Sequence, residues 1–386
     1  MKSPPLSTIS LLVLLAAIGA CRGSNSATPA DARSTDTADS GDHATGWVFD
    51  GGGGEYFTPA ALGDSHVYTG NWDGRLYALD FDGRVAWTHD TGGRIDSAPT
   101  VTVDGDVVVG SWSGEVVEVS ASGDAQWSRD LGAPIDHSVS LGPRGTRYAA
   151  TLEGTVYALH DDGSTRWRHE LKVEPSTALA IDGRSLPPRM FVGGADGKVY
   201  CLAGPSIAGR VQLRGAPTGH IAIDGEGRAV VTTAKGRAYR ITPECEISRK
   251  VNPIYPPLTG AVVGPGDTAY VGGIGYKERF FRLKSDFTVG WKAQTGTGGV
   301  FVTAPAIAKT GDLWGSARGL IRATPEGEVH RADATPLLHS PVWTDRAVYA
   351  PTEHGTFAKI GREMPELADG PWPTLHGDFR RTGSVD

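Results

Sequence analysis

Cysteine chemistry is the first possibility that the sequence raises. The chain of 386 residues has three cysteines, Cys21, Cys201 and Cys245, and no CxxC pair, so the spacing supports neither a zinc-binding pair nor a dithiol redox centre. A disulfide requires α-carbons within about 7 Å of each other. We expect Cys201 and Cys245 to be separate buried thiols, because one falls in a predicted strand and the other in a turn of the next repeat, at a different height. A bridge between them is the alternative.

A second group of reactive side chains lies in the C-terminal tail, where His376, Asp378 and Arg380 stand close together. No Ser or Cys lies within residues 370–383, so the tail offers no nucleophile for this group to activate. We therefore predict that residues 362–386 form a cap across one face of the folded domain. A segment that binds a partner is the alternative.

The N-terminus has the pattern of an export signal. The apolar stretch Ile9–Ala20 is too short to cross a bilayer as a helix, which takes about 20 residues, but it fits the core of a secretory signal. It ends in Ile18-Gly19-Ala20-Cys21, which is similar to a bacterial lipobox and implies removal of residues 1–20 and lipidation of Cys21. A signal with an incidental cysteine is the alternative. Arg22, where some lipoproteins have Asp, favours anchoring in an outer membrane facing the periplasm.

Composition limits the remaining possibilities. Residues 21–44 carry almost no large apolar side chain, so we expect a disordered linker after the lipidated cysteine. The 53 Gly and 25 Pro argue against a helical bundle, since both residues destabilise helix interiors. The formal net charge of −7 and the lack of a basic run argue against a nucleic-acid partner.

Internal repeats organise the rest of the chain. Each unit has an apolar run, a turn and an alternating run, which is typical of a β-hairpin. A tryptophan follows in several units, at positions 87, 127, 167 and 291, whereas Val211, Arg249 and His330 take its place in others. The turns are centred at Gly74, Gly114, Gly154, Gly197, Gly236, Glu278, Gly319 and Gly355.

The two ends of the repeat region complete each other. Trp47 precedes Pro59 as Trp87 precedes Pro99, so the chain begins with an outer strand that has no inner strands of its own. Residues 342–360 supply inner strands without an outer one. Pairing the two ends removes both free sheet edges. The sequence thus predicts an all-β, eight-bladed β-propeller of four-stranded antiparallel blades over residues 45–361, its last blade closed by the N-terminal strand. Seven blades are the alternative, if the poor repeat near Tyr276 is not a blade.

Two sets of residues are candidates for a site. Trp72 and Trp112 precede hairpin turns and are either exposed anchors for a partner or packing between blades. A ring of residues at the start of the inner strands either lines a wet funnel or is kept small by crowding at the axis, which is the interpretation we favour. The two ring histidines fall in distant blades, so we expect no metal site. The ring consists of Phe57, Ser97, His137, Thr177, Gly219, Thr259, Thr303 and His339.

The stretch Gly74-Arg75-Leu76-Tyr77-Ala78-Leu79-Asp80, followed by Gly83-Arg84-Val85-Ala86-Trp87, resembles the repeat of the PQQ-like (pyrroloquinoline-quinone-type) propeller family over about residues 45–360. Length, lipobox, linker and predicted blade number are also similar to the BamB-type lipoproteins of the outer-membrane β-barrel assembly machinery. Quinoprotein dehydrogenases of the family hold the quinone with calcium, and many carry an adjacent Cys-Cys pair. This chain has no such pair, and beyond the linker its only asparagines are Asn71 and Asn252. We therefore expect neither PQQ nor calcium.

Together these features predict a non-enzymatic, monomeric lipoprotein of the cell envelope. Its propeller would act as a scaffold for envelope proteins, with barrel-assembly components among the candidate partners, and it would touch the membrane only through its lipid anchor. The alternative is a small-molecule-binding or PQQ-dependent dehydrogenase-like protein that uses the central funnel.

Overall fold

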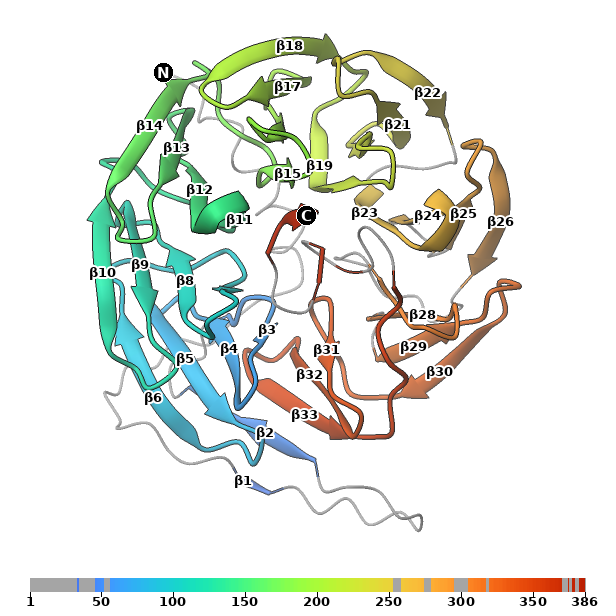
Figure 1. Ribbon diagram of the computed structural model, residues 1–386. Coiled ribbons are helices and arrows are strands. Elements are labelled where there is room, and N and C mark those ends of the chain that lie inside the picture. The colour runs from blue at the N-terminus through green and yellow to red at the C-terminus, as the bar shows by residue number, and fades with distance from the viewer. Residues whose placement is uncertain are drawn as a thin grey trace, which may run out of the picture.

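The computed structural model describes residues 33–34, 46–51, 56–252, 258–273, 279–294, 305–316, 319–369, 374, 377–378 and 382–385. These residues contain no α-helix, only strands and two short 3-10 turns, η1 (Pro143–Gly145) and η2 (Pro265–Asp267). The strands form eight sheets arranged around a ring, which confirms the eight-bladed β-propeller (Figure 1). Within each blade we name the strands A to D from the axis to the rim.

Four blades come from the first half of the chain. Blade 1 is β3 (Ala61–Leu62), β4 (His66–Gly70), β5 (Arg75–Asp80) and β6 (Val85–Asp90), and blade 2 is β7 (Thr100–Val101), β8 (Val107–Gly110), β9 (Glu115–Val119) and β10 (Ala125–Asp130). Blade 3 is β11 (Ser140–Gly142), β12 (Thr146–Ala150), β13 (Thr155–Leu159) and β14 (Thr165–Glu170). Blade 4 is β15 (Ala180–Asp182), β16 (Arg189–Gly193), β17 (Lys198–Ala203) and β18 (Ser206–Gln212).

The second half supplies the others. Blade 5 is β19 (Pro217–Ile223), β20 (Ala229–Thr233), β21 (Arg237–Ile241) and β22 (Ile247–Val251), and blade 6 is β23 (Leu258–Val263), β24 (Ala269–Gly273), β25 (Arg279–Leu283) and β26 (Val289–Gln294). Blade 7 is β27 (Ala306–Ile307), β28 (Leu313–Ser316), β29 (Leu320–Ala323) and β30 (Val329–Asp333). Blade 8 has β31 (Val342–Trp343), β32 (Ala347–Pro351) and β33 (Phe357–Gly361) as its inner strands.

The N-terminal strand closes the ring as the sequence predicts. β2 (Trp47–Phe49) pairs antiparallel with β33, with Trp47 opposite Lys359 and Phe49 opposite Phe357. Strand D of blade 8 therefore comes from the start of the domain. Within the predicted linker, β1 (Arg33–Ser34) pairs with the outer edge of β2. An edge strand offers unpaired backbone groups that another segment can satisfy, which accounts for structure at two residues of a linker expected to have none.

A contact that recurs between successive blades is a tryptophan over a glycine of the next C–D turn. Trp87 of β6 lies against Gly123 in the C–D turn of blade 2, where a β-carbon on that glycine would stand 2.7 Å from the Trp87 ring. The Trp87 indole N–H donates to the Ala121 carbonyl of the same turn at 3.0 Å. Trp47 repeats both contacts on the C–D turn of blade 1, with Gly83 and, at 3.1 Å, the Phe81 carbonyl. The ring is thus closed by the same contact that joins its interior blades.

Between blades 4 and 5 a disulfide replaces this contact. The D-strand position that holds tryptophan in blades 1, 3 and 6 is Gly209 in blade 4, opposite Cys201. Cys245 stands in the C–D turn of blade 5 at the position that Gly123 holds in the C–D turn of blade 2. In both turns the backbone N–H of this residue donates to the carbonyl of the residue three positions earlier. Cys201 and Cys245 are bonded, with α-carbons 5.9 Å apart. The expectation of separate thiols is therefore wrong: without a side chain at Gly209, the third strand of one blade faces the turn of the next directly.

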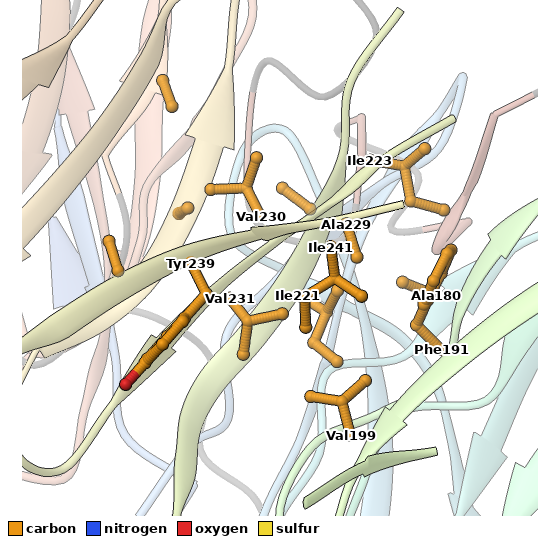
Figure 2. Packing of buried hydrophobic residues seen from close by; sticks show 14 of the residues in the cluster. Ala180, Phe191, Val199, Ile221, Ile223, Ala229, Val230, Val231, Tyr239 and Ile241 are labelled. Carbon is orange, nitrogen blue, oxygen red and sulfur yellow. The ribbon is translucent and has the colours of Figure 1, made fainter. Parts of the chain in front are cut away.

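The same register corrects one repeat assignment. Val211 was predicted to stand in the tryptophan position of blade 4, but Gly209 stands there. Arg249 and His330 do take the equivalent places in blades 5 and 7, opposite Arg240 and Arg322. Figure 2 shows the apolar packing between blades 4 and 5, with Phe191 of β16 near Ile221 of β19.

The C-terminal tail contacts opposite sides of the ring. The Lys309 N–H of blade 7 donates to the Glu366 carbonyl, and the Leu141 N–H of blade 3 donates to the Thr382 carbonyl. β34 (Ser384–Val385) runs parallel to β15 as an additional strand on its inner edge. The C-terminus consequently lies at the centre of the ring (Figure 1). These contacts involve the A–B ends of the blades, so we call this end of the propeller the A–B face.

We predict that Gly123→Ala destabilises the protein by about 2–4 kcal/mol, because the methyl group adds overpacking against Trp87 to the strain of a positive φ. Gly105→Ala is the matched control: Gly105 has φ 90° in the same blade, but a β-carbon there meets nothing within 4 Å. It should cost only about 1–2 kcal/mol. Urea unfolding measures both, and equal losses would contradict the tryptophan–glycine contact.

We predict that Cys201→Ala combined with Cys245→Ala lowers the free energy of unfolding by about 2–4 kcal/mol, since the bridge closes a loop with a sequence separation of 44. Hydrogen exchange should show the loss concentrated in blades 4 and 5. Peptide mapping without reductant tests the bond itself, and two free thiols in the oxidised protein would contradict it.

Candidate docking surface

Two of the eight predicted ring residues, Thr177 and Thr259, are engaged in hydrogen bonds with backbone groups. The Thr177 hydroxyl accepts from the Gly193 N–H at 2.9 Å, and the Thr259 hydroxyl accepts from the Gly272 N–H at 3.1 Å. Both threonines are buried, as is Ser97. Thr177 and Thr259 therefore join strand A to strand B within their own blades, and neither lines a wet funnel.

In blade 1 the ring residue is Thr58, not Phe57. The Thr58 hydroxyl accepts from the Gly70 N–H at 2.9 Å, which is the bond that Thr177 makes in blade 4. Phe57 is 1% exposed and packs edge-on against Tyr77 and Phe357. The prediction was off by one residue because the connection from Trp47 to the inner strand, which contains the glycines 51–54, is one residue longer than the connection after Trp87.

The remaining ring positions differ in their surroundings. His137 and His339 are half-buried, and a ring nitrogen of His137 lies 3.3 Å from the Pro175 carbonyl. Gly219 is exposed at a positive φ of 69°. Thr303 and the predicted lipidation site Cys21 lie outside the described residues. The structure therefore brings no complete ring of ligand-binding groups together in its described part.

Trp72 and Trp112 lie on the opposite end of the propeller from the A–B face, in the B–C turns of blades 1 and 2. We call this end the B–C face; it also contains the connections from each D strand to the next A strand. Both indoles are half-buried. The Arg94 guanidinium lies over both rings, with its carbon 3.6 Å from the Trp112 centroid and 5.2 Å from the Trp72 centroid. The backbone N–H of Trp112 donates to the backbone carbonyl of Arg94. This hydrogen bond fixes the B–C turn of blade 2 against the connection that enters the blade.

Two carboxylates support this stack. Asp96 pairs with Arg94 at 2.9 Å, and Asp136, from the connection entering blade 3, accepts the indole N–H of Trp112 at 3.3 Å. Burial, followed by the adjacent Asp136 charge, raises the pKa of Asp96 to about 7, although Arg94 opposes the shift. The Asp96 side chain is only 13% exposed. We name Trp72, Arg94, Asp96, Trp112 and Asp136 the stack cluster. The cluster brings together a guanidinium, two indole rings and two carboxylates from three successive blades.

Of this cluster, sequence reasoning found only the tryptophans. It left open whether they are anchors or packing; in the structure each ring contacts Arg94 and keeps part of its surface exposed. A signal for the acidic pair was present: Asp96 and Asp136 occupy the same position of successive repeats, separated by 40 residues. Equivalent residues of adjacent blades lie side by side in a propeller, so two acids there predict a close pair.

In the described part of the chain, no three or more His, Cys, Asp or Glu residues are grouped so that they could hold a metal ion. No described helix is long and apolar enough to cross a membrane.

We predict that Asp96→Asn flattens the pH dependence of stability. Because the folded-state pKa of Asp96 is raised to about 7, its folded form retains a proton that the unfolded chain releases near pH 4. Wild-type stability therefore has a component that is lost as pH rises from about 4 to about 7, and the variant lacks it. Urea unfolding across this range measures the slope. Glu153→Gln, at an exposed position on the same face, should keep the wild-type slope; an unchanged slope in Asp96→Asn contradicts the assignment.

The comparisons with known proteins agree with this architecture. A family model described as outer membrane protein assembly factor BamB matches residues 34–130 and 112–205, which is less than half of the chain. A search of curated proteins finds no match.

Solved structures show the same fold. BamB from Moraxella catarrhalis has a TM-score of 0.63 and 12% identity, covering 87% of this chain and 99% of its own. Saccharomyces cerevisiae Sqt1 has a TM-score of 0.67 and 14% identity, covering 83% and 98%. Virginiamycin B lyase from Staphylococcus aureus has a TM-score of 0.54 and 13% identity, covering 79% and 94%. Identities this low carry the fold alone. Together with the repeats matched by the family model, they support a PQQ-like β-propeller that is similar to BamB.

Proposed function

We propose that this protein is a lipid-anchored scaffold of the bacterial cell envelope that binds other envelope proteins through its B–C face. The BamB-like propeller fold supports a protein-interaction role in general. The anchor is inferred from the lipobox-like sequence that ends at Cys21, and barrel-assembly components are the partner class suggested by the relationship to BamB.

The disulfide supports export. Disulfides persist in oxidising compartments such as the periplasm and are rare in the cytosol. Here the bond between Cys201 and Cys245 takes the place of a blade-to-blade contact that other interfaces make with tryptophan. A propeller whose ring is joined in this way suits a protein that folds after crossing the inner membrane.

The observation that carries the docking role is the stack cluster. Tryptophan and arginine are the residue types most enriched among interface hot spots, and here they are held rigidly by cation–π contacts and an ion pair. The A–B face, by contrast, receives the chain's own tail. The B–C face is therefore the end of the propeller that retains a preorganised aromatic surface for a partner.

Of the alternatives, an enzyme that uses the funnel has no specific support. The likeness to virginiamycin B lyase is one of fold. Two of the predicted ring side chains, Thr177 and Thr259, hydrogen-bond to backbone N–H groups. We assign no reaction to the described residues.

We predict that the protein incorporates radiolabelled palmitate and partitions into membranes, and that Cys21→Ser abolishes both. A photo-crosslinking residue placed at position 112 should capture envelope proteins in cells, whereas one at position 104, on the exposed A–B turn of the same blade, should not.

Each part can fail separately. Absence of acylation in the wild type contradicts the anchor. Equal capture from both faces, or none from position 112, contradicts docking through the B–C face.

A further inference from the structure

The B–C face is charged unevenly. On blades 1–3 it carries a group of exposed or half-buried carboxylates that we call the acidic sector: Asp73, Asp90, Glu115, Asp130, Glu153, Glu170 and Glu174. The cations on the same part of the face are Arg75, which pairs with Asp73 at 3.6 Å, Lys172, and Arg94, which is engaged with the stack cluster. Arg129 and Arg168 lie on the rim strands β10 and β14, which end at Asp130 and Glu170 of the acidic sector.

The neighbouring blades have the opposite sign. On the B–C face of blades 4 and 5 the exposed or half-buried cations are Lys198, Arg214, Lys235 and Arg237, and Asp196 is paired with Lys198. Acids therefore outnumber cations on blades 1–3 of this face, and cations outnumber acids on blades 4 and 5. Separated charge of this kind steers and orients a partner of complementary pattern.

The stack cluster lies at the inner end of the acidic sector. The groups that face the Asp96 carboxyl are Arg94, Asp136 and the indole N–H of Trp112. His137 follows Asp136 but has a ring nitrogen at the Pro175 carbonyl. Arg94 pairs with Asp96, whereas the adjacent Asp136 accepts from the neutral indole N–H of Trp112, so the two acids have capacity for a second positive charge.

We propose that the acidic sector binds a basic segment of a partner protein, with one Lys or Arg side chain placed over the Asp96–Asp136 pair beside Trp112. This inference rests on the proposed docking role and specifies the chemistry of the partner. The tryptophan edges supply the apolar contact, and the surrounding carboxylates attract the rest of the segment.

Proton release is a consequence of this arrangement. At neutral pH Asp96 is partly protonated because burial and the adjacent Asp136 charge raise its pKa to about 7. An incoming cation favours the ionised form and displaces a proton. Affinity should therefore rise between about pH 6 and about pH 8, a range in which ordinary exposed carboxylates are already ionised.

The test uses fluorescein-labelled decalysine and decaglutamate as probes of the full-length protein, with fluorescence anisotropy as the readout. Decalysine should bind, more weakly at higher salt, and decaglutamate should bind at least about tenfold more weakly. Glu153→Lys combined with Glu170→Lys should lower decalysine affinity about fivefold or more. Asp104→Lys combined with Asp161→Lys changes the net charge equally but on the A–B face, where both positions are exposed, and should change affinity by less than about twofold.

Asp96→Asn tests the inner position. It should leave binding measurable but remove the rise in affinity between about pH 6 and about pH 8. His137→Gln should retain that rise. Equal effects of the two charge-reversal pairs, or a rise that persists in Asp96→Asn, would overturn the proposal. If these peptide experiments fail while position 112 still crosslinks to envelope proteins, the docking role stands and only the basic chemistry of the partner is wrong.

Discussion

Contact between the two outermost strands of one blade and the C–D turn of the next is the constraint on which the ring depends. Blades diverge toward the rim, so the gap there must be filled or bridged. Trp87 over Gly123 fills it with a large ring. The Cys201–Cys245 disulfide bridges it covalently. Between blades 5 and 6, the buried Arg240 fills it by stacking 4.9 Å from Phe287, whose φ is also positive. Three chemistries thus solve one geometric problem, and the left-handed turn residue is common to all of them.

A ring held in this way can carry electrostatic strain on one face. The buried charges of Arg147 and Glu118 are paired directly: Arg147 donates to both carboxylate oxygens of Glu118, at 2.7 and 2.6 Å, across the interface of blades 2 and 3. In the Asp96–Asp136 pair, Arg94 forms its ion pair with Asp96, and Asp136 accepts a hydrogen bond from the neutral indole of Trp112. Perturbed titration beside exposed aromatic rings is a common property of functional sites. The rigid blades supply the preorganisation, because a mobile loop would separate two like charges.

The repeat pattern was enough to predict the architecture. Turn glycines and outer tryptophans set the number of blades, and Trp47 without inner strands of its own identified the closing strand. What the pattern could not supply was register in irregular places. The glycine-rich connection before Phe57 is one residue longer than its counterpart in blade 2, and the repeat pattern did not show this shift of the ring position. The disulfide was missed because Gly209 has no side chain at the tryptophan position, and the absence of a side chain gives no motif to recognise. Arg94 was not predicted for a different reason. Its contacts with Trp72 and Trp112 form only when turns from separate blades come together in the folded ring.

Native-state hydrogen exchange of β2 tests the central claim most directly, since amides in a closed ring open only with the sheet that contains them. We predict that the amides of Trp47–Phe49 exchange as slowly as those of β33 and of the interior outer strand β10. Exchange of β2 at the rate of an unstructured peptide, with β33 still protected, would show that the N-terminal strand is not part of blade 8 and that the ring is not closed through Trp47 and Gly83.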